Sequence, residues 1–172
     1  MIHSPAVNTK ELKVSDSVEL IENLSLDEVA SIMKDDDIWP FVSEDGISKK
    51  DYYPVDHPAF RYLGIYVKGD LAGLFFVHPD NGFTSVRAHI AILKPFRALY
   101  ALSAVGKLVE WFTTISDRVQ KMNAMIPEYN NGAIRLAIES GFKKEGVNRE
   151  SIMKDGKLYD QIQFGITRKE AL

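Results

Sequence analysis

Hydrophobic residues along the chain follow two periods, and the change between them separates strands from helices. Alternating residues predict three strands joined by short turns, over 60–67, 71–78 and 84–93. The turns fall at 68–70 and 79–82. From 98 to 115 the apolar positions recur every three or four residues, the period of an amphipathic helix. The middle of the chain is therefore predicted to be an antiparallel meander that leads into a long helix.

The N-terminal flank has weaker patterns. Irregular alternation over 12–21 predicts one short strand, after a loose polar terminus at 1–10. Ser25 and Glu28 have the spacing of a capping box, so a helix is expected over 26–34. Residues 35–58 hold prolines, a glycine and four aromatic residues, which predict an ordered loop with one helical turn.

The C-terminal third returns to short elements. A strand is expected over 121–126, and a helix from Asn130 that Gly141 ends. A last hairpin is predicted from the strands 142–147 and 158–166, with its turn at Asp155-Gly156. This order predicts an α+β fold in one domain, residues 1–172.

Composition and charge exclude several classes of protein. The 172 residues include no cysteine, which excludes disulfides and thiol nucleophiles. We see no membrane span and no secretion signal, and expect a cytoplasmic protein. The first 56 residues hold 13 acidic and 5 basic side chains, whereas the rest hold 11 and 16. The basic side chains are too scattered for nucleic acid but suit a phosphate-bearing ligand. The histidines and Asp35–Asp37 lack the spacing of metal ligands.

The segment from Ile92 to Leu102 is the first candidate for chemistry. A strand there runs through a turn containing Pro95 into the long helix. The first amides of a helix have no internal partners, so with the helix dipole they can bind a phosphate. Arg97 at this point adds a charged, forked donor. The segment is therefore a candidate anion site.

A second motif suggests a family. It starts at Asn130 and has the spacing Asn130-x-x-Ala133-x-x-Leu136-x-x-x-x-Gly141-Phe142, with Lys144-Glu145-Gly146 and Asp160 further on. Together with the Ile92–Arg97 region, it resembles the GNAT superfamily of acyl-CoA-dependent N-acyltransferases, within it most closely the group that acetylates ribosomal-protein N-termini. The resemblance covers residues 60–168. The chain is also similar to GNAT-like proteins encoded by tailed bacteriophages.

The resemblance implies a fold and a binding site. It implies a twisted, mostly antiparallel sheet of six or seven strands flanked by helices, in which strand 84–93 splays from strand 121–126. The pantetheine arm of acetyl-CoA would enter that gap, and an amide near Ile92 would hold the thioester oxygen. Main-chain groups at Ile92 and Lys94 would pair with the arm, the amides of Ala98–Leu102 would hold the pyrophosphate, and Asn130 would bond the cofactor. The implied cofactor-binding residues are Ile92, Leu93, Lys94, Arg97, Ala98, Leu99, Tyr100, Ala101, Leu102 and Asn130.

Three positions depart from the family pattern. Tyr100 and Leu102 stand where the family has small residues, and Ala137 stands where many members have a tyrosine that acts as general acid. His89 is the candidate base, because neutral imidazole accepts protons near neutral pH, although a structural role for it stays open. Tyr129 is a further candidate for proton transfer.

These features predict an N-acetyltransferase that moves an acetyl group from acetyl-CoA to a primary amine: a protein N-terminus, a lysine or a small amine. An acidic segment, comprising Asp35, Asp36, Asp37, Glu44 and Asp45, would favour a cationic acceptor. The alternative is a catalytically degenerate protein of this fold that serves as a phage virion or assembly component. Phage structural proteins and a second copy of the chain are the protein partners considered, in the host cytoplasm or the virion. We expect no metal, nucleic acid or membrane partner.

Overall fold

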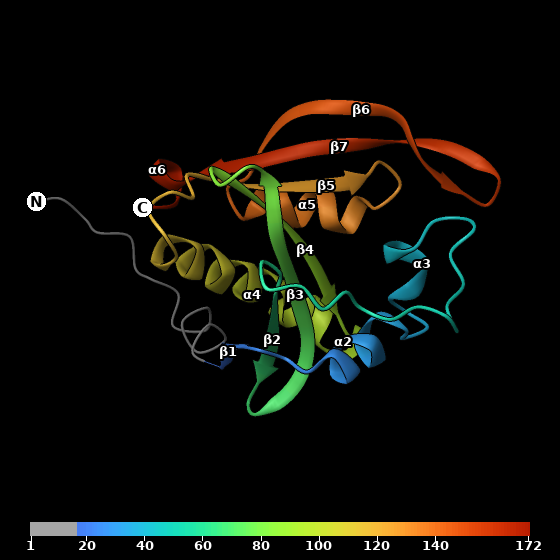
Figure 1. The fold of residues 1–172 in the computed structure, drawn as a ribbon, viewed down its shortest axis with the longest axis horizontal. Helices are drawn as coiled ribbons and strands as arrows, with labels where there is room; N and C mark the ends of the chain where they lie inside the picture. Colours follow the sequence, from blue (N-terminus) through green and yellow to red (C-terminus); the bar gives the residue numbers. More distant parts are fainter. Residues whose placement is uncertain (1–16) are drawn as a thin grey trace, which may run out of the picture.

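The computed structural model describes residues 17–172, and within them the strands form one seven-stranded sheet. Its spatial order is β1-β2-β3-β4-β5-β7-β6 (Figure 1). The strands are β1 (Val18–Glu22), β2 (Arg61–Val67), β3 (Asp70–Asn81), β4 (Ser85–Ile92), β5 (Lys121–Pro127), β6 (Lys143–Lys154) and β7 (Lys157–Thr167). All neighbours are antiparallel except β4 and β5, which are parallel. The predicted fold class and the antiparallel meander are confirmed.

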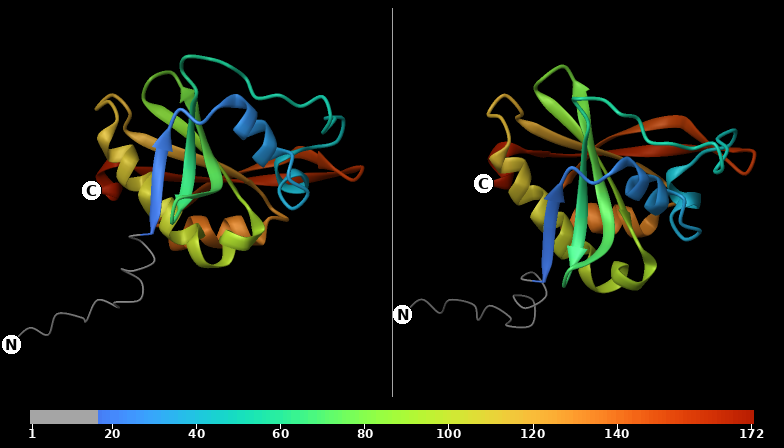
Figure 2. Two further views of the ribbon diagram at one scale, coloured as in Figure 1. Left: turned by 90° about the horizontal axis from the view of Figure 1, so that it is seen from below. Right: turned by 60° about the horizontal axis from the view of Figure 1, so that its bottom comes forward.

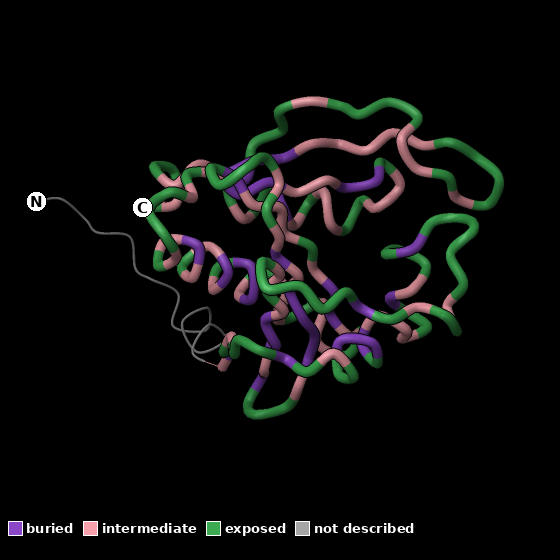
Figure 3. Tube along the Cα trace, in the orientation of Figure 1, coloured by how far each residue is buried: buried purple, intermediate pink, exposed green. Residues whose placement is uncertain are grey.

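The helices cover both faces of the sheet, with α4 and α5 on one face and α2 on the other (Figure 2). Apolar residues of α4 and α5 pack into a large core cluster, and α2 packs into a smaller one. Figure 3 shows many buried positions in the central strands, whereas strand β6 at the edge of the sheet is mostly exposed. The helices are α2 (Leu26–Met33), α3 (Trp39–Val42), α4 (Lys94–Thr114), α5 (Asn131–Glu139) and α6 (Arg168–Ala171).

Local sequence signals account for several element ends. Ser25 and Glu28 form the expected capping box at the start of α2. Asp155 and Gly156 both have positive φ, at 53° and 73°, as the two-residue turn between β6 and β7 requires. Gly141 follows α5 with φ of 89°, a conformation that favours glycine. The single helical turn expected in the 35–58 loop is α3.

Some boundaries differ from the predictions. Strand β3 continues through the turn predicted at 79–82, because Pro79 pairs with Val86 of β4 where the register shifts. Strand β6 runs on to Lys154 rather than ending at Val147, and α6 was not predicted. The strand predicted at 12–21 is found at Val18–Glu22, and its first part and the terminus at 1–10 lie outside the described residues.

Candidate active site

The sheet opens between β4 and β5. These strands pair at only three positions, Ser85–Lys121, Val86–Met122 and Arg87–Asn123. Beyond them, residues 88–92 and 124–127 diverge, and a cavity of about 490 Å³ occupies the space. We name it the gap cavity; both strands line it, through Ala88, Ile90, Ala124 and Ile126. The predicted splay between these two strands is confirmed.

The open edge of β4 presents main-chain groups to this gap. The Leu93 amide donates to Ala72 O at 2.9 Å, so it is directed at β3. Along an antiparallel strand the hydrogen-bonding direction alternates from residue to residue. The main-chain groups of Ile92 and Ile90 therefore point toward the gap. An extended ligand could pair with them as an added strand does.

Arg97 is used inside the protein. Its Nε and Nη2 donate to Ile92 O at 3.2 and 3.0 Å, and Nη2 also donates to Asp37 O at 3.1 Å. The guanidinium thus ties the start of α4 to the end of β4 and to the loop before α3. The carbonyl of Ile92 is consequently engaged, whereas its amide faces the gap.

Helix α4 begins at Lys94, four residues before the predicted start at Ala98. In an α-helix each amide from the fifth residue on bonds the carbonyl four residues earlier, so the amides of Ala98–Leu102 lie within the helical pattern. The reason lies in the sequence: alanine and leucine are strong helix formers, and Pro95 suits the first turn. Tyr100 and Leu102, which stand where small residues were expected, continue the helix.

A second cavity, of about 700 Å³, lies beside the gap between α4 and α5. We name it the α4–α5 cavity. Most predicted cofactor-binding residues line it: Ile92, Lys94, Arg97, Ala98, Ala101, Leu102 and Asn130. Leu99 is instead 56% exposed, and Tyr100 packs against Phe96 and the core, so its ring does not fill this cavity. Their roles toward a cofactor stay predictions.

Asn130 is the N-cap of α5. Its Oδ1 accepts from the Ala133 amide at 3.2 Å, which satisfies one of the free amides of the helix start. The residue lines both the gap cavity and the α4–α5 cavity. Its contact with a cofactor stays a prediction, while its side-chain oxygen caps the helix.

His89 lies on β4 and lines the gap cavity. Its Nε2 is 3.0 Å from Nε2 of His78 on β3, and its ring stacks on Phe76 at 5.3 Å between centroids. Burial within this cleft lowers the pKa of His89 to about 4, and the neighbouring His78 and Arg87 lower it further. His89 is therefore neutral at pH 7, and the residue is exposed where it lines the cavity.

Tyr129 follows β5 and lines the α4–α5 cavity. Its ring meets Tyr159 edge to face at 4.9 Å. Its hydroxyl is buried and has no hydrogen-bond partner among residues 17–172. Burial raises the pKa of Tyr129, and Tyr159 and nearby carboxylates add to this effect. A protonated, unpartnered phenol can donate to a ligand, which keeps Tyr129 a candidate.

Three polar residues beside the site were not predicted. Arg87 and Asp80 form an ion pair at 2.7 Å, and Asn123 Nδ2 donates to the same carboxylate at 2.7 Å. They lie where β4 and β5 part, and Arg87 also lines the gap cavity. Only its i+2 spacing from His89 could have indicated that Arg87 shares the histidine's face.

The acidic segment mostly binds the protein itself. Asp36 pairs with Lys49 and Asp37 pairs with Lys94, while Asp35 accepts from the Asp37 amide. Their charges are thus partly balanced within the fold. Glu44 differs, because it is exposed and lines the gap cavity.

Asp45 closes one wall of the site. Its carboxylate accepts from the amides of Asp155 and Gly156 at 3.0 and 2.7 Å, and its own amide donates to Met153 O. Lys154 Nζ adds a bond to Ser43 O at 3.1 Å. The loop after α3 is thereby joined to the tip of the β6–β7 hairpin, next to the gap cavity (Figure 1).

The comparisons with known proteins agree with this geometry. The structure aligns with spermidine N-acetyltransferase from Vibrio cholerae, solved in complex with CoA and spermine, at a TM-score of 0.75 and 18% identity, over 91% of this chain and 98% of that one. The chain has the GNAT fold. RimJ from Mycobacterium smegmatis, in complex with CoA-disulfide, aligns at 0.72 and 16% over 89% and 83%. A GNAT-family acetyltransferase from Bacillus anthracis aligns at 0.57 and 14% over 63% and 66%.

A curated relative extends the comparison to the sequence. The chain is 31% identical over 114 residues to the SPbeta prophage-derived uncharacterized N-acetyltransferase YokL of Bacillus subtilis (strain 168). The match spans 64% of this chain and 63% of the relative. No protein-family model matches the sequence. The predicted resemblance to the GNAT superfamily is thus confirmed by a similar fold and by a similar relative.

Residues 17–172 contain no cluster of three or more histidine or acidic side chains placed to hold a metal ion. None of their helices is long and apolar enough to cross a membrane.

Proposed function

We propose that the protein is an N-acyltransferase that transfers an acetyl group from acetyl-CoA to a primary amine. The main observation in support is the opening between β4 and β5. It leaves main-chain groups at the edge of β4 unpaired beside a cavity. The prophage N-acetyltransferase and the acetyltransferases of the same fold, two of them solved with CoA, support it. The resemblance to a prophage protein also supports a phage-encoded enzyme that acts in the host cytoplasm.

The pantetheine arm would run from the α4–α5 cavity into the gap, along the free edge of β4. The amides of Ile90 and Ile92 would donate to the arm and to the thioester oxygen, on which negative charge develops. The five amides of Ala98–Leu102 do not fit a pyrophosphate, because the helix engages them. Basic side chains at the cavity, Lys94 and Arg135, would hold that end of the donor.

The acceptor amine would enter the gap cavity from the face that carries His89. Glu44 would attract its ammonium group, since this exposed carboxylate lines the cavity. Neutral His89 would remove one proton from the ammonium, and the free amine would attack the thioester carbon. The remaining proton would leave with the thiolate, and positioning in the gap would supply much of the rate.

Thermal unfolding with acetyl-CoA tests the donor side. A ligand present at about 100 times its Kd stabilises the folded state by about 2.7 kcal/mol. We expect an increase in melting temperature with acetyl-CoA, and thiol release when a panel of small amines, polyamines and peptides is added.

The early start of α4 favours one alternative, a non-catalytic protein of this fold in a phage particle. It predicts no stabilisation by acetyl-CoA or longer acyl-CoAs and no thiol release with any acceptor. That result would overturn the proposed activity.

A further inference from the structure

Two histidines meet across strands β3 and β4. Their Nε2 atoms are 3.0 Å apart, and their rings stack at 5.1 Å between centroids. His89 lines the gap cavity, whereas His78 lines a separate cavity of about 280 Å³ walled by aromatic rings. The pair thus lies between two neighbouring cavities, on one face of strands β3 and β4.

The contact of His78 with the main chain determines which atoms carry protons. His78 Nδ1 lies 2.8 Å from Pro79 O, and a carbonyl oxygen can only accept, so Nδ1 carries the hydrogen. Neutral His78 then has its lone pair on Nε2, which must accept from Nε2–H of His89. The lone pair of His89 is consequently on Nδ1, the nitrogen left available to a ligand.

We propose that His78 is a positioning residue for His89: it fixes the tautomer that leaves Nδ1 as the proton acceptor, and it shares the proton that His89 takes from the acceptor amine. This inference rests on the proposed acetyl transfer. It follows the logic by which a second group orients a catalytic imidazole in the tautomer that the reaction needs.

The protons balance over one turnover. The bound ammonium gives one proton to His89 Nδ1, and the Nε2–H of His89 moves along the hydrogen bond toward His78 Nε2. The free amine then forms the N–C bond, the C–S bond breaks, and the second amine proton neutralises the leaving thiolate. The proton held by the histidine pair passes to water. The products are the amide, the free thiol and one proton.

The surroundings of the pair favour a short-lived charge. Arg87 beside it opposes a resting imidazolium, while Asp80, which is bound to Arg87, favours one. Other titratable groups near the pair are Tyr62, which stacks on Phe76, and His57, which packs on Phe60. Tyr52 lines both cavities, and Glu44 lines the gap cavity with His89. Phe60 and Phe76 both contact His78, so the stack fixes the ring without bonding its Nε2.

Nitrogen NMR of the resting protein tests the tautomer without any substrate. With ¹⁵N-labelled histidine, we expect a pyridine-type Nδ1 and a pyrrole-type Nε2 for His89, and the reverse for His78. A pyrrole-type Nδ1 on His89 would overturn the inference whatever the activity. If the tautomers are as expected but no acetyl transfer occurs, the proposed function fails and the catalytic role of the pair fails with it.

Two substitutions separate positioning from packing. His78→Phe keeps a ring in the stack but cannot accept a hydrogen bond, and His78→Gln keeps an acceptor but cannot hold a proton. We expect kcat to fall about tenfold in H78F, with the KM for acetyl-CoA unchanged, and less in H78Q. Because His78 lowers the pKa of His89, its loss should move the acid limb of kcat/KM to higher pH. Wild-type kcat and an unmoved limb in H78F would overturn the inference.

Discussion

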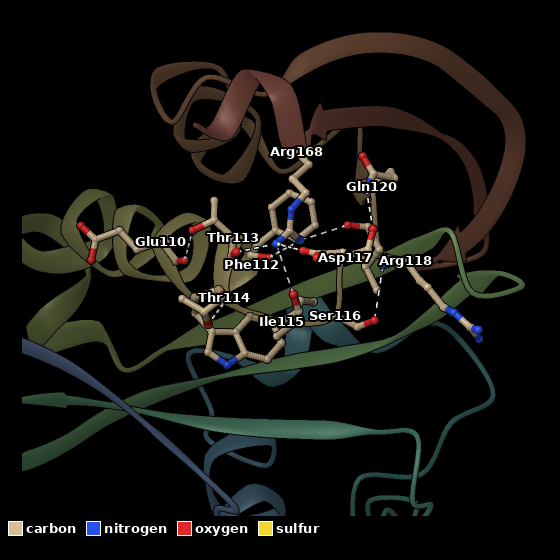
Figure 4. Close-up of polar contacts among 12 residues, drawn as sticks. Glu110, Phe112, Thr113, Thr114, Ile115, Ser116, Asp117, Arg118, Gln120 and Arg168 are labelled. Carbon is tan, nitrogen blue, oxygen red and sulfur yellow. Dashed lines mark hydrogen bonds and ion pairs between the residues drawn. The ribbon is translucent and has the colours of Figure 1, made fainter.

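The two ends of the contact between β4 and β5 differ in how their polar groups are used. At the closed end, three pairs of residues bond the strands, and Gln120 N donates to Thr84 O at 2.8 Å. Arg168 lies at the same end and donates to the carbonyls of Thr113, in the last turn of α4, and Ile115, its C-cap (Figure 4). At the open end, the main-chain groups of Ile90 and Ile92 face a cavity.

This difference separates stability from binding along one pair of strands. Groups at the closed end satisfy one another, so they hold the two halves of the sheet together. At the open end Arg97 binds the Ile92 carbonyl, whereas the Ile92 amide and the main-chain groups of Ile90 have no strand to pair with and remain available to a ligand. Substitutions at the closed end should therefore change the free energy of unfolding, and those at the open end should change binding or rate.

The largest effect is expected from Arg168→Met at the closed end. The guanidinium is 13% exposed and donates to the carbonyls of Thr113 at 2.5 Å and Ile115 at 3.2 Å, with longer bonds to two others. Loss of these charge-assisted bonds should lower the free energy of unfolding by about 3 kcal/mol. Urea denaturation measures it, with the exposed Arg149→Met as control. Equal free energies of unfolding in the two variants would contradict the stabilising role of the closed end.

At the open end, His89→Ala should lower kcat about 100-fold, the lower range for loss of a general base. CoA affinity, measured by calorimetry, should stay the same because the role proposed for His89 concerns the acceptor and not the donor. In the wild type, His89 must be neutral to accept a proton and its pKa is about 4. Proton removal by His89 should thus continue as pH falls from 7, and the acid limb of the pH–rate profile should lie near pH 4. An acid limb of the pH–rate profile near pH 6.5 would contradict the role of His89 as the base.

Ala101→Trp should block the α4–α5 cavity and raise the Kd for CoA at least about tenfold, because a bulky side chain there occupies the donor's space. Glu110→Trp, on the exposed surface of the same helix, is the matched control. Calorimetry with CoA measures both. Unchanged affinity in A101W would show that the donor binds elsewhere.

The smallest effect is expected from Asp45→Ala, which should raise the acceptor KM a few-fold and leave CoA binding unchanged. The Gly156 and Asp155 amides hold the pKa of Asp45 below its usual value. The bonds are therefore complete above the unfolded pKa of about 3.9 and are lost as pH falls through the folded value. The Gly156 amide shift in NMR should follow this titration. Asp51→Ala, in the same loop, is the control.

Much of the fold could be predicted from local signals. Alternation placed β2 and most of β3 and β4, and the Ser25 cap and the Asp155-Gly156 turn marked element ends. Errors arose where two local signals conflicted or where pairing decided the outcome. The helix-forming residues after Pro95 extended α4 backwards, and pairing with β4 carried β3 through Pro79.

The candidate site was predictable in part. The motif around Asn130 indicated the gap and its two walls, and His89 was named from its residue type and strand. The partner His78, the ion pair of Arg87 with Asp80, and the roles of Asp45 and Arg97 depend on strand register and on contacts between distant segments. No local pattern encodes these contacts.

The bonds from Asp45 to the hairpin turn join positions 110 and 111 residues apart. During synthesis, the loop after α3 must therefore wait for nearly the whole chain before its partner leaves the ribosome. The β4 edge and α4 are complete much earlier. A nascent or truncated chain that ends before Asp155 would possess the free edge of β4 but would lack the bonds that hold the loop after α3 against the hairpin. If the proposed function holds, the enclosure on the acceptor side is therefore the last part of the site to form.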